Sequence, residues 1–170
     1  MLRGILSLRE LYETIILRIK ELLDQDLVGV IIFGSTVYLG RGRDIDLIVV
    51  VKKERDPRES LSLEYKLRRI LEEEFKGLAF DVHVFSFKEF KENLKPGTFL
   101  SGLALGYEIL HGEPLLEPLI LEFLKELSRE KYILHNKYGS WNLSHYAKIT
   151  YNLKVKHRII RNQMKRIHST

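Results

Sequence analysis

Two repeating patterns of apolar and polar positions divide the first half of the chain into helices and strands. Apolar residues recur every three or four positions from Leu8 to Leu23, directly after the capping-box sequence Ser7-Leu8-Arg9-Glu10, and they predict a helix. A second apolar stripe predicts a helix over 61–75 that ends at Gly77. Apolar or alternating stretches of strand length occupy three further segments, namely 27–33, 44–51 and 78–85.

The next part of the chain is predicted to be helical, over the segments 87–94, 99–110 and 119–127. Pro114 and Pro118 mark the loosest boundary in the chain, because proline lacks the backbone N–H that a helix interior uses. We therefore divide the chain into a domain of residues 1–113 and a C-terminal extension of residues 114–170.

The C-terminal extension ends in a long predicted helix. Asn142 is a plausible N-cap, and the sequence from there to about Ile167 contains neither glycine nor proline. Apolar and half-polar residues recur along this helix at the spacing of a stripe that packs on a partner: Leu143, Tyr146, Thr150, Leu153, His157, Ile160, Met164 and Ile167. The whole order of elements indicates an α/β (α+β) fold, with a small mixed β-sheet flanked by helices and a helical C-terminal extension.

The amino-acid composition excludes several classes of protein and of functional site. A chain of 170 residues, 45% hydrophobic and 30% charged, is too apolar for a disordered protein. No apolar run is long enough to span a membrane, and no signal peptide is recognisable, so we expect a soluble, cytoplasmic protein without membrane contact. The absence of cysteine excludes disulfides, thiolate zinc sites and cysteine nucleophiles.

Charge is distributed unevenly along the chain, whose net charge is +5. Residues 129–170 hold ten Lys or Arg and one acid, Glu130, which is a net charge of +9. The remaining 128 residues hold 18 Lys or Arg and 22 Asp or Glu, which is a net charge of −4. Such a basic arm is expected to contact RNA, the acidic domain of the same chain or another subunit, unless its cations simply face water.

Three aspartates stand where strands of the sheet begin. Asp44 and Asp46 lie two residues apart in one strand, so their side chains point to the same face. Two carboxylates so close repel each other unless a cation lies between them, and oxygen ligands suit Mg²⁺ above all. Asp81, on the next predicted strand, is a candidate third carboxylate that could hold a second ion. His83 shares its face, but a partly buried sheet histidine is the commoner situation, so we leave it outside the site.

A glycine-containing turn precedes the two aspartates. Gly34 lets the backbone approach a ligand, Ser35 offers a hydroxyl, and a short helical turn starting there would aim its positive end at anions. Arg41 and Arg43 add positive charge to the same loop. Phosphate-binding groups on one side and metal-binding carboxylates on the other indicate a nucleoside triphosphate site.

At these residues the sequence resembles the DNA polymerase β-like nucleotidyltransferase superfamily. Its motif begins with an apolar residue, then a glycine, and then a second glycine or a serine. A variable loop and Asp-x-Asp follow, and a third acid lies on a later strand. The matching segments here are Phe33-Gly34-Ser35 and Asp44-Ile45-Asp46. Within the superfamily the chain is most similar to kanamycin-type antibiotic nucleotidyltransferases and to minimal nucleotidyltransferases, small proteins often encoded beside HEPN-domain partners in a toxin–antitoxin setting.

The resemblance covers about residues 8–112, and it implies a short helix from Phe99 followed by a strand over Leu105–Leu110. It also implies that Gly34 and Ser35 hold the triphosphate, and that the three aspartates bind two Mg²⁺ ions. The loop after Ser35 is about two residues shorter than usual, and Val37 and Tyr38 replace a small residue and an arginine. Either Arg41 or Arg43 supplies the missing cation, or the triphosphate site is altered.

The function implied by the resemblance is transfer of a nucleoside monophosphate, with ATP as the expected donor, to an acceptor hydroxyl on a protein, a small molecule or an RNA end. Asp81 would orient or activate that hydroxyl. The expected partners are the nucleotide, a HEPN-like protein and RNA at the basic residues 129–170. The alternative function is an antitoxin-like or nucleic-acid-binding protein that retains a vestigial nucleotide site.

Overall fold

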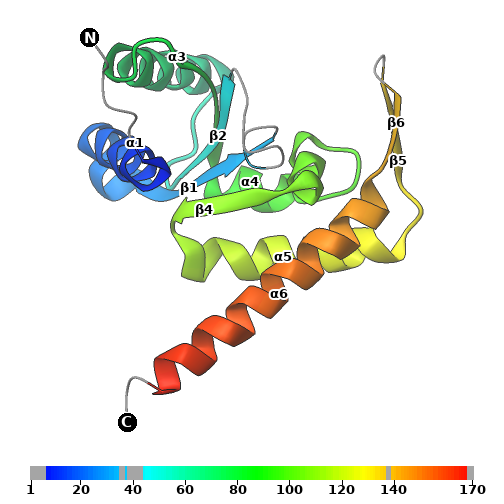
Figure 1. Ribbon diagram of the computed structural model, residues 1–170. Coiled ribbons are helices and arrows are strands. Elements are labelled where there is room, and N and C mark those ends of the chain that lie inside the picture. The colour runs from blue at the N-terminus through cyan, green and yellow to red at the C-terminus, as the bar shows by residue number, and fades with distance from the viewer. Residues whose placement is uncertain (1–6, 35–36, 38–43, 137–138, 168–170) are drawn as a thin grey trace.

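A computed structural model describes residues 7–34, 37, 44–136 and 139–167 of the chain. Helices and strands alternate along it (Figure 1). The α-helices are α1 (Leu8–Leu23), α3 (Pro57–Glu74), α4 (Phe87–Asn93), α5 (Glu113–Arg129) and α6 (Leu143–Ile167). The strands are β1 (Leu27–Phe33), β2 (Asp44–Val51), β3 (Ala79–Ser86), β4 (Tyr107–His111), β5 (Ile133–Asn136) and β6 (Gly139–Asn142). Two 3₁₀ helices, η1 (Asp24–Asp26) and η2 (Phe99–Leu105), complete the elements.

Strands β1 to β4 form one mixed sheet in the order β3-β2-β1-β4. The pair β2 and β3 is parallel, and α3 connects them, whereas β1 runs antiparallel to both β2 and β4. The predicted small mixed sheet is therefore confirmed. None of the helices in the described part of the chain is long and apolar enough to cross a membrane.

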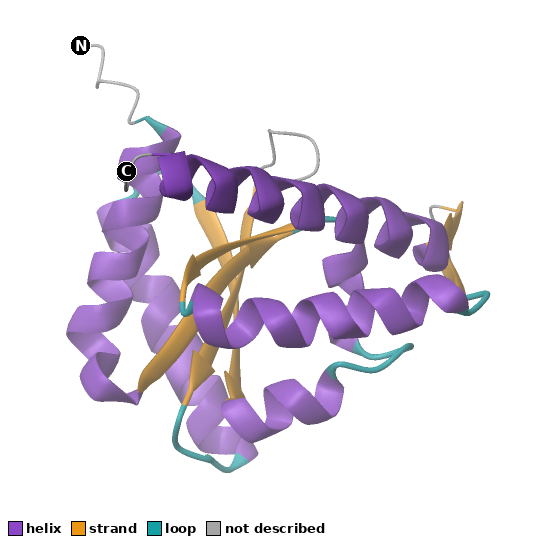
Figure 2. Cartoon of the chain, turned by 90° about the horizontal axis from the view of Figure 1, so that it is seen from below, coloured by secondary structure: helices purple, strands orange, loops and turns teal. Residues whose placement is uncertain are grey.

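Helices cover both faces of this sheet, as two views of the chain show (Figures 1 and 2). On one face, α1 and α3 pack their buried residues, such as Ile19 and Leu71, against alternate residues of the strands. On the other face lie α4, η2, α5 and the first turns of α6, with Phe90, Leu103 and Phe123 among their buried residues. Because strand side chains alternate between faces, β-branched residues in β1 and β2 fill both layers.

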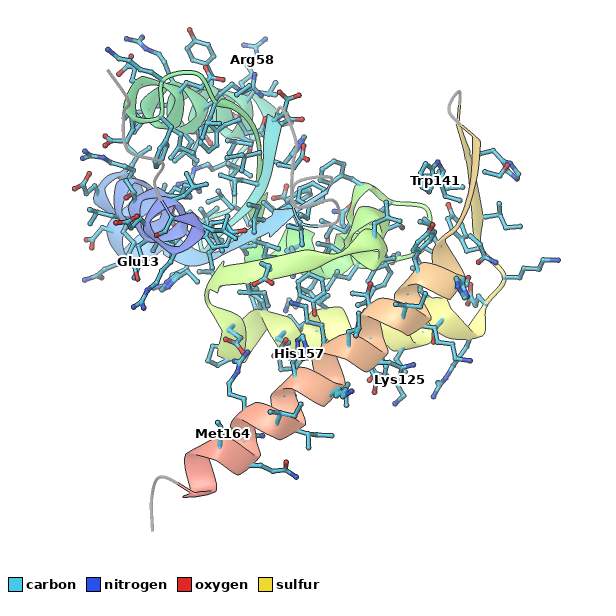
Figure 3. All side chains as sticks on the ribbon, viewed as in Figure 1. Glu13, Arg58, Lys125, Trp141, His157 and Met164 are labelled. Carbon is cyan, nitrogen blue, oxygen red and sulfur yellow. The ribbon has the colours of Figure 1, made fainter. Side chains whose placement is uncertain are left out.

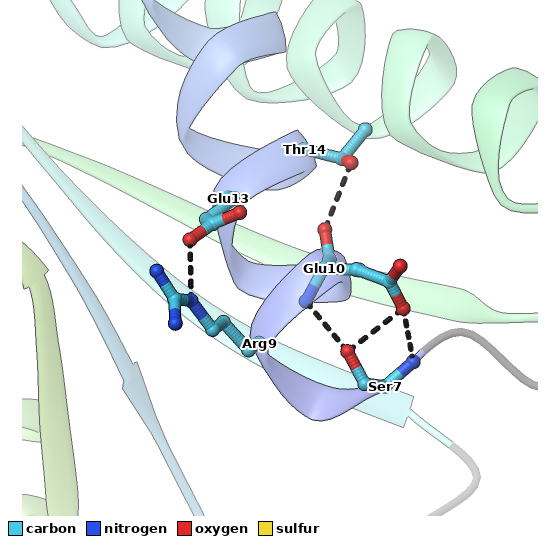
Figure 4. A network of polar contacts seen from close by, with 5 residues as sticks. All are labelled: Ser7, Arg9, Glu10, Glu13 and Thr14. Carbon is cyan, nitrogen blue, oxygen red and sulfur yellow. Dashed lines mark hydrogen bonds and ion pairs between the residues drawn. The ribbon is translucent and has the colours of Figure 1, made fainter.

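The predicted N-terminal helix is confirmed at both ends. Its start is encoded locally, by residues three positions apart. The Ser7 hydroxyl accepts a hydrogen bond from the Glu10 N–H at 3.2 Å, and the Glu10 carboxylate accepts one from the Ser7 N–H at 2.7 Å (Figure 4). Helix α3 has the same type of start, with Asp56 as N-cap, Pro57 in the first turn and Glu59 completing the box. It therefore begins four residues before the predicted position.

The helix predicted over 99–110 is wrong beyond Leu105. There η2 ends, Gly106 adopts a φ of 133°, and residues 107–111 become the edge strand β4. Strand pairing with β1 decides this conformation, and pairing between distant segments overrides local helical spacing. The strand implied by the family resemblance over Leu105–Leu110 is confirmed in this respect.

Helix α5 runs continuously through both prolines, so it begins six residues before the helix predicted over 119–127. Pro114 lies in the first turn, where the missing N–H costs no helical hydrogen bond, and Pro118 lies inside the helix. Buried residues of α5 on the sheet side, including Ile120 and Leu124, belong to one core with the strands. The division of the chain at residues 113 and 114 stays a prediction.

A hairpin and a long helix form the C-terminal part of the described chain. Strands β5 and β6 form a hairpin that the sequence analysis did not predict. Helix α6 follows directly, as predicted, and the Asn142 side chain accepts a hydrogen bond from the His145 N–H at 3.1 Å. The predicted helical turn over 36–40 lies outside the described residues, apart from Val37, which is helical.

Candidate active site

One row of residues crosses all four strands at one end of the sheet. Asp81 of β3 pairs with Asp46 of β2, Asp46 pairs with Phe33 of β1, and Phe33 pairs with Tyr107 of β4. Paired residues in neighbouring strands point to the same face, here the face that α4, η2, α5 and α6 cover. Asp44 lies two residues before Asp46, so three aspartates share this end of the sheet and this face.

Asp46 is a partly buried carboxylate surrounded by negative charge. Among the described residues, none donates a hydrogen bond to it, although Asp81 and Asp44 are close enough to act on its charge. Burial raises the pKa of Asp46, and the charges of Asp81 and Asp44 raise it further, whereas His83 lowers it. A cation placed among these carboxylates would reverse this effect.

Asp81 is held by two side chains in addition to its place on the strand. Its carboxylate accepts a hydrogen bond from an Arg68 guanidinium nitrogen at 3.2 Å, and its other oxygen lies 3.3 Å from His83 Nε2. The His83 ring in turn lies against Phe99, with 4.3 Å between the ring centroids. These contacts orient the Asp81 carboxylate at the mouth of the sheet.

His83 and Arg68 were missed as members of the site by the sequence analysis. The spacing of His83 and Asp81 on one strand was a sufficient signal for a shared face, but the commoner role of a sheet histidine was preferred. Arg68 left no signal, because only the packing of α3 beside β3 brings residues 68 and 81 together.

Gly34 lies directly against the Asp46 carboxylate. A Cβ atom at residue 34 would come within 2.4 Å of Asp46 Oδ2, and the backbone φ of 79° is one that side chains other than glycine rarely adopt. The Val37 N–H donates to the Gly34 carbonyl at 3.2 Å and closes a turn there. The glycine therefore provides both the turn at the end of β1 and the space that Asp46 occupies.

Three other predicted site residues, Ser35, Arg41 and Arg43, lie outside the described residues. The structure thus brings together Gly34, Asp44, Asp46 and Asp81 from three strands. The assignment of Ser35, Arg41 and Arg43 to phosphate binding stays a prediction.

The residues present suit a hard divalent cation by their donor chemistry. Carboxylate oxygens are the preferred protein ligands of Mg²⁺. The pKa of Asp46 is raised by burial and then by the negative charges of Asp81 and Asp44, and a cation would oppose the effect of these charges. Within the described ranges, however, no three His, Asp or Glu side chains are grouped closely enough to hold a metal. Asp81 is engaged by Arg68 and His83 instead.

A cavity of about 360 Å³ is bordered by Val37, whose N–H closes the turn at Gly34. Val37 forms part of its wall, together with Tyr107 at the start of β4 and several residues of α6, among them Tyr146 and Leu153. Its volume lies within the range of small-molecule sites, and its lining is mainly apolar and aromatic. The start of β4 and the helix α6 therefore line this cavity, whereas Asp44, Asp46 and Asp81 are not among its lining residues.

The family model of the nucleotidyltransferase domain matches residues 13–102. The chain belongs to this family. The match includes the glycine turn and all three aspartates of this nucleotidyltransferase domain, whereas most of the cavity wall and all of α6 follow the matched residues. The comparison with curated proteins gave no match.

Solved structures with a similar fold include two toxin–antitoxin complexes. One contains a tri-AMPylated HEPN toxin from Shewanella oneidensis with an MNT antitoxin, at 16% identity and a TM-score of 0.47, and the match covers 71% of this chain and 87% of that chain. The other contains AMP-PNP, at 17% identity and a TM-score of 0.46, with 69% and 87% covered.

A third similar structure is a spectinomycin adenyltransferase, AAD(9), from Enterococcus faecialis with ATP and spectinomycin. It is 19% identical, with a TM-score of 0.37, and the match covers 82% of this chain and 59% of that chain. Because all these identities and TM-scores are low, the family assignment rests on the match to residues 13–102.

Proposed function

We propose that this nucleotidyltransferase domain transfers a nucleoside monophosphate from a nucleoside triphosphate, with ATP as the expected donor, to an acceptor hydroxyl. The acceptor is a group on a protein, a small molecule or an RNA. The observation that carries the proposal is the pairing of Asp46 with Asp81, next to Asp44 and against Gly34. Family membership supports the same reaction class.

Asp44, Asp46 and Asp81 would hold two Mg²⁺ ions in this proposal. When bound, such ions supply positive charge to the oxygens that attack and leave in phosphoryl transfer. Gly34 and Ser35 would hold the triphosphate through backbone N–H groups and the serine hydroxyl, with Arg41 and Arg43 adding positive charge. The protein then contributes mainly positioning and electrostatic stabilisation.

The proposed reaction is a single displacement at the α-phosphorus. The acceptor oxygen forms a bond to the α-phosphorus, the bond to the bridging oxygen between the α- and β-phosphates breaks, and pyrophosphate leaves. Asp81 accepts the proton of the acceptor hydroxyl as general base. Arg68 and His83 are positioning residues here, because they contact Asp81 and hold its carboxylate in place.

The proposal includes a HEPN-like partner protein, with RNA as an alternative partner of the basic residues 129–170. The partner rests on the sequence resemblance to minimal nucleotidyltransferases, and the RNA contact on the net charge of +9 in this segment. A role as an antitoxin-like binding protein with an inactive nucleotide site is the outcome expected if no transfer occurs.

Position-specific labels of ATP test the reaction. The protein is incubated with Mg²⁺, an extract of the source organism as supply of acceptors, and ATP labelled at either the α- or the γ-phosphate. We expect label from the α-phosphate in a macromolecular or small-molecule product, and label from the γ-phosphate in released pyrophosphate. Transfer of the γ label to an acceptor would contradict the proposal.

Two variants make the test specific to the site. Asp46→Asn should abolish α-label transfer, whereas Asp24→Asn should leave it unchanged, since Asp24 is an exposed aspartate beyond the end of α1 with no place in the site. Calorimetry with ATP and Mg²⁺ gives a second readout. Absence of binding at millimolar nucleotide, together with absence of transfer, would favour the antitoxin-like role.

A further inference from the structure

The two halves of α6 differ in how they are packed. The buried residues of this helix, Leu143, Ser144, Ala147 and Thr150, all lie in its first eight residues, where it packs on α5 and η2. Every residue from Lys156 to Met164 is exposed. In Figure 1 the C-terminal end of α6 extends past α5, and Met164 marks this free end in Figure 3.

An apolar stripe runs along α6 from its packed first half into its exposed second half, and we define it by Ile149, Leu153, Ile160 and Met164. These residues are four, seven and four positions apart, so they follow one side of the helix. Their exposed fractions are 43%, 52%, 47% and 54%. Side chains of this kind in a row along a helix, here interrupted by Lys156, are typical of an interaction surface rather than of scattered surface residues.

The α6 stripe is continuous with the cavity beside the glycine turn. Ile149 and Leu153 belong to the stripe and also line the cavity of about 360 Å³, together with Val37 and Tyr107. A surface that combines an apolar row with an adjoining pocket can receive an anchoring side chain from a partner. The pocket would place that partner beside the predicted phosphate-binding turn.

The cations of α6 near the stripe differ in whether they pair with an acidic side chain. On the inner side of α6, Arg161 forms an ion pair with Glu113 of α5. Among the residues that the structure describes, Lys148 and Lys156 form no ion pair and are exposed. Residues 131–170 contain no Asp or Glu at all, so no acid of α6 itself can pair with these two lysines.

We propose that the α6 stripe binds an acidic amphipathic helix of a partner protein. The aliphatic row matches the apolar face of such a helix, and the exposed cations Lys148 and Lys156 match its acidic residues. RNA fits less well, because residues 152–167 contain no Phe, Tyr or Trp on which bases could stack. A second α6 fits less well too, because its cations would meet like charges.

A photo-crosslinking residue at position 160 tests the proposal in the full-length chain, expressed in the source organism. Position 162 is the matched control, since it is exposed but lies about 200° around the helix from position 160. The cross-linked protein and the cross-linked peptide are identified by mass spectrometry. We expect an acidic, amphipathic helical segment of one identified protein, with at least about fivefold more product at position 160 than at 162.

Reversing the charge of a lysine provides a second test of the proposed partner. Lys156→Glu should reduce this cross-link at least about fivefold, and Lys76→Glu, an exposed lysine after α3, should not. A cross-link to RNA, to another copy of this chain or to a segment without acidic residues would overturn the proposal, as would equal products at 160 and 162. Asp46→Asn should leave the cross-link intact, so this surface is tested separately from nucleotidyl transfer.

Discussion

Two aspartates at opposite ends of β1 have opposite surroundings. Asp26 precedes the strand, and its side chain is only 10% exposed. Its carboxylate accepts a hydrogen bond from the Lys53 N–H at 2.9 Å and pairs with the Arg55 guanidinium. Asp46 lies beside the other end of β1, where the charges of Asp81 and Asp44 oppose its ionisation and only His83, among the described residues, favours it.

The pKa values of the two residues move in opposite directions for this reason. Burial raises the pKa of Asp26, but the hydrogen bonds from Arg55 and Lys53 and their charges outweigh it, so the pKa is lowered. The pKa of Asp46 is raised by burial and then by Asp81 and Asp44. A satisfied carboxylate of the first kind stabilises the fold, whereas a crowded one of the second kind is a candidate for a functional site.

Replacement of Asp46 should have the largest effect on activity. Asp46→Asn, and Asp44→Asn likewise, should lower nucleotidyl transfer by about 10²-fold or more, because charge that would hold a cation is removed. The melting temperature should stay equal or rise, since the substitution relieves carboxylate repulsion. Transfer of the α label and calorimetric unfolding measure the two effects, and full activity in either variant would refute the assignment.

The reverse result is expected for Asp26→Asn. This variant should lose about 1–3 kcal/mol of unfolding free energy, because the Arg55 charge is left without its partner in a partly buried position. Nucleotidyl transfer measured well below the melting temperature should be unchanged. Denaturant unfolding gives the free energy, and a loss of transfer without a loss of stability would break the comparison.

Acid unfolding sharpens the same comparison. The folded-state pKa of Asp26 is lowered, so its contribution to stability is present above the ordinary aspartate pKa of about 3.9 and is lost as pH falls through the folded value. The stability difference between the wild type and Asp26→Asn should therefore shrink below about pH 4. A constant difference across this range would show that Asp26 does not act through its charge.

Gly34→Ala tests how closely the turn and Asp46 fit together. Both the positive φ and the contact of the new Cβ with Asp46 Oδ2 oppose the substitution, and we expect a loss of about 1–2 kcal/mol of stability with weaker ATP binding. Gly77→Ala is the matched control, since its φ of 96° is similar but nothing lies within 4 Å of its Cβ position. Equal losses of stability in the two variants would show that the contact with Asp46 contributes nothing to the effect of Gly34→Ala.

Glu117 of α5 provides the smallest expected effect. Burial raises its pKa, as does the neighbouring Glu113, and the cations Lys154, Arg161 and Arg158 do not fully compensate. A raised carboxylate pKa lowers stability once pH exceeds the unfolded value, so Glu117→Gln should raise stability at pH 7 by less than about 1 kcal/mol. The gain in stability should vanish near pH 4. Thermal unfolding of the variant and the wild type at pH 7 and pH 4 measures this difference.

Local signals explain what could be predicted of the fold. The start of α1 follows from Ser7 and Glu10, because a capping box is made by residues three positions apart. Strand β2 and the shared face of Asp44 and Asp46 follow from the two-residue period of a strand. In contrast, β4 could not be derived from the periodicity of residues 107–111, because pairing with β1 determines it.

The sequence by itself determined the nucleotidyltransferase motif, the cap of the first helix and the concentration of basic charge after residue 128. Only the tertiary structure decided that Asp81 pairs with Asp46, that Arg68 and His83 hold Asp81, and that the second half of α6 stays uncovered. The physical reason is range. Capping and side-chain period act over a few residues, whereas the register of a sheet and the covering of a helix depend on segments that meet only in the folded chain.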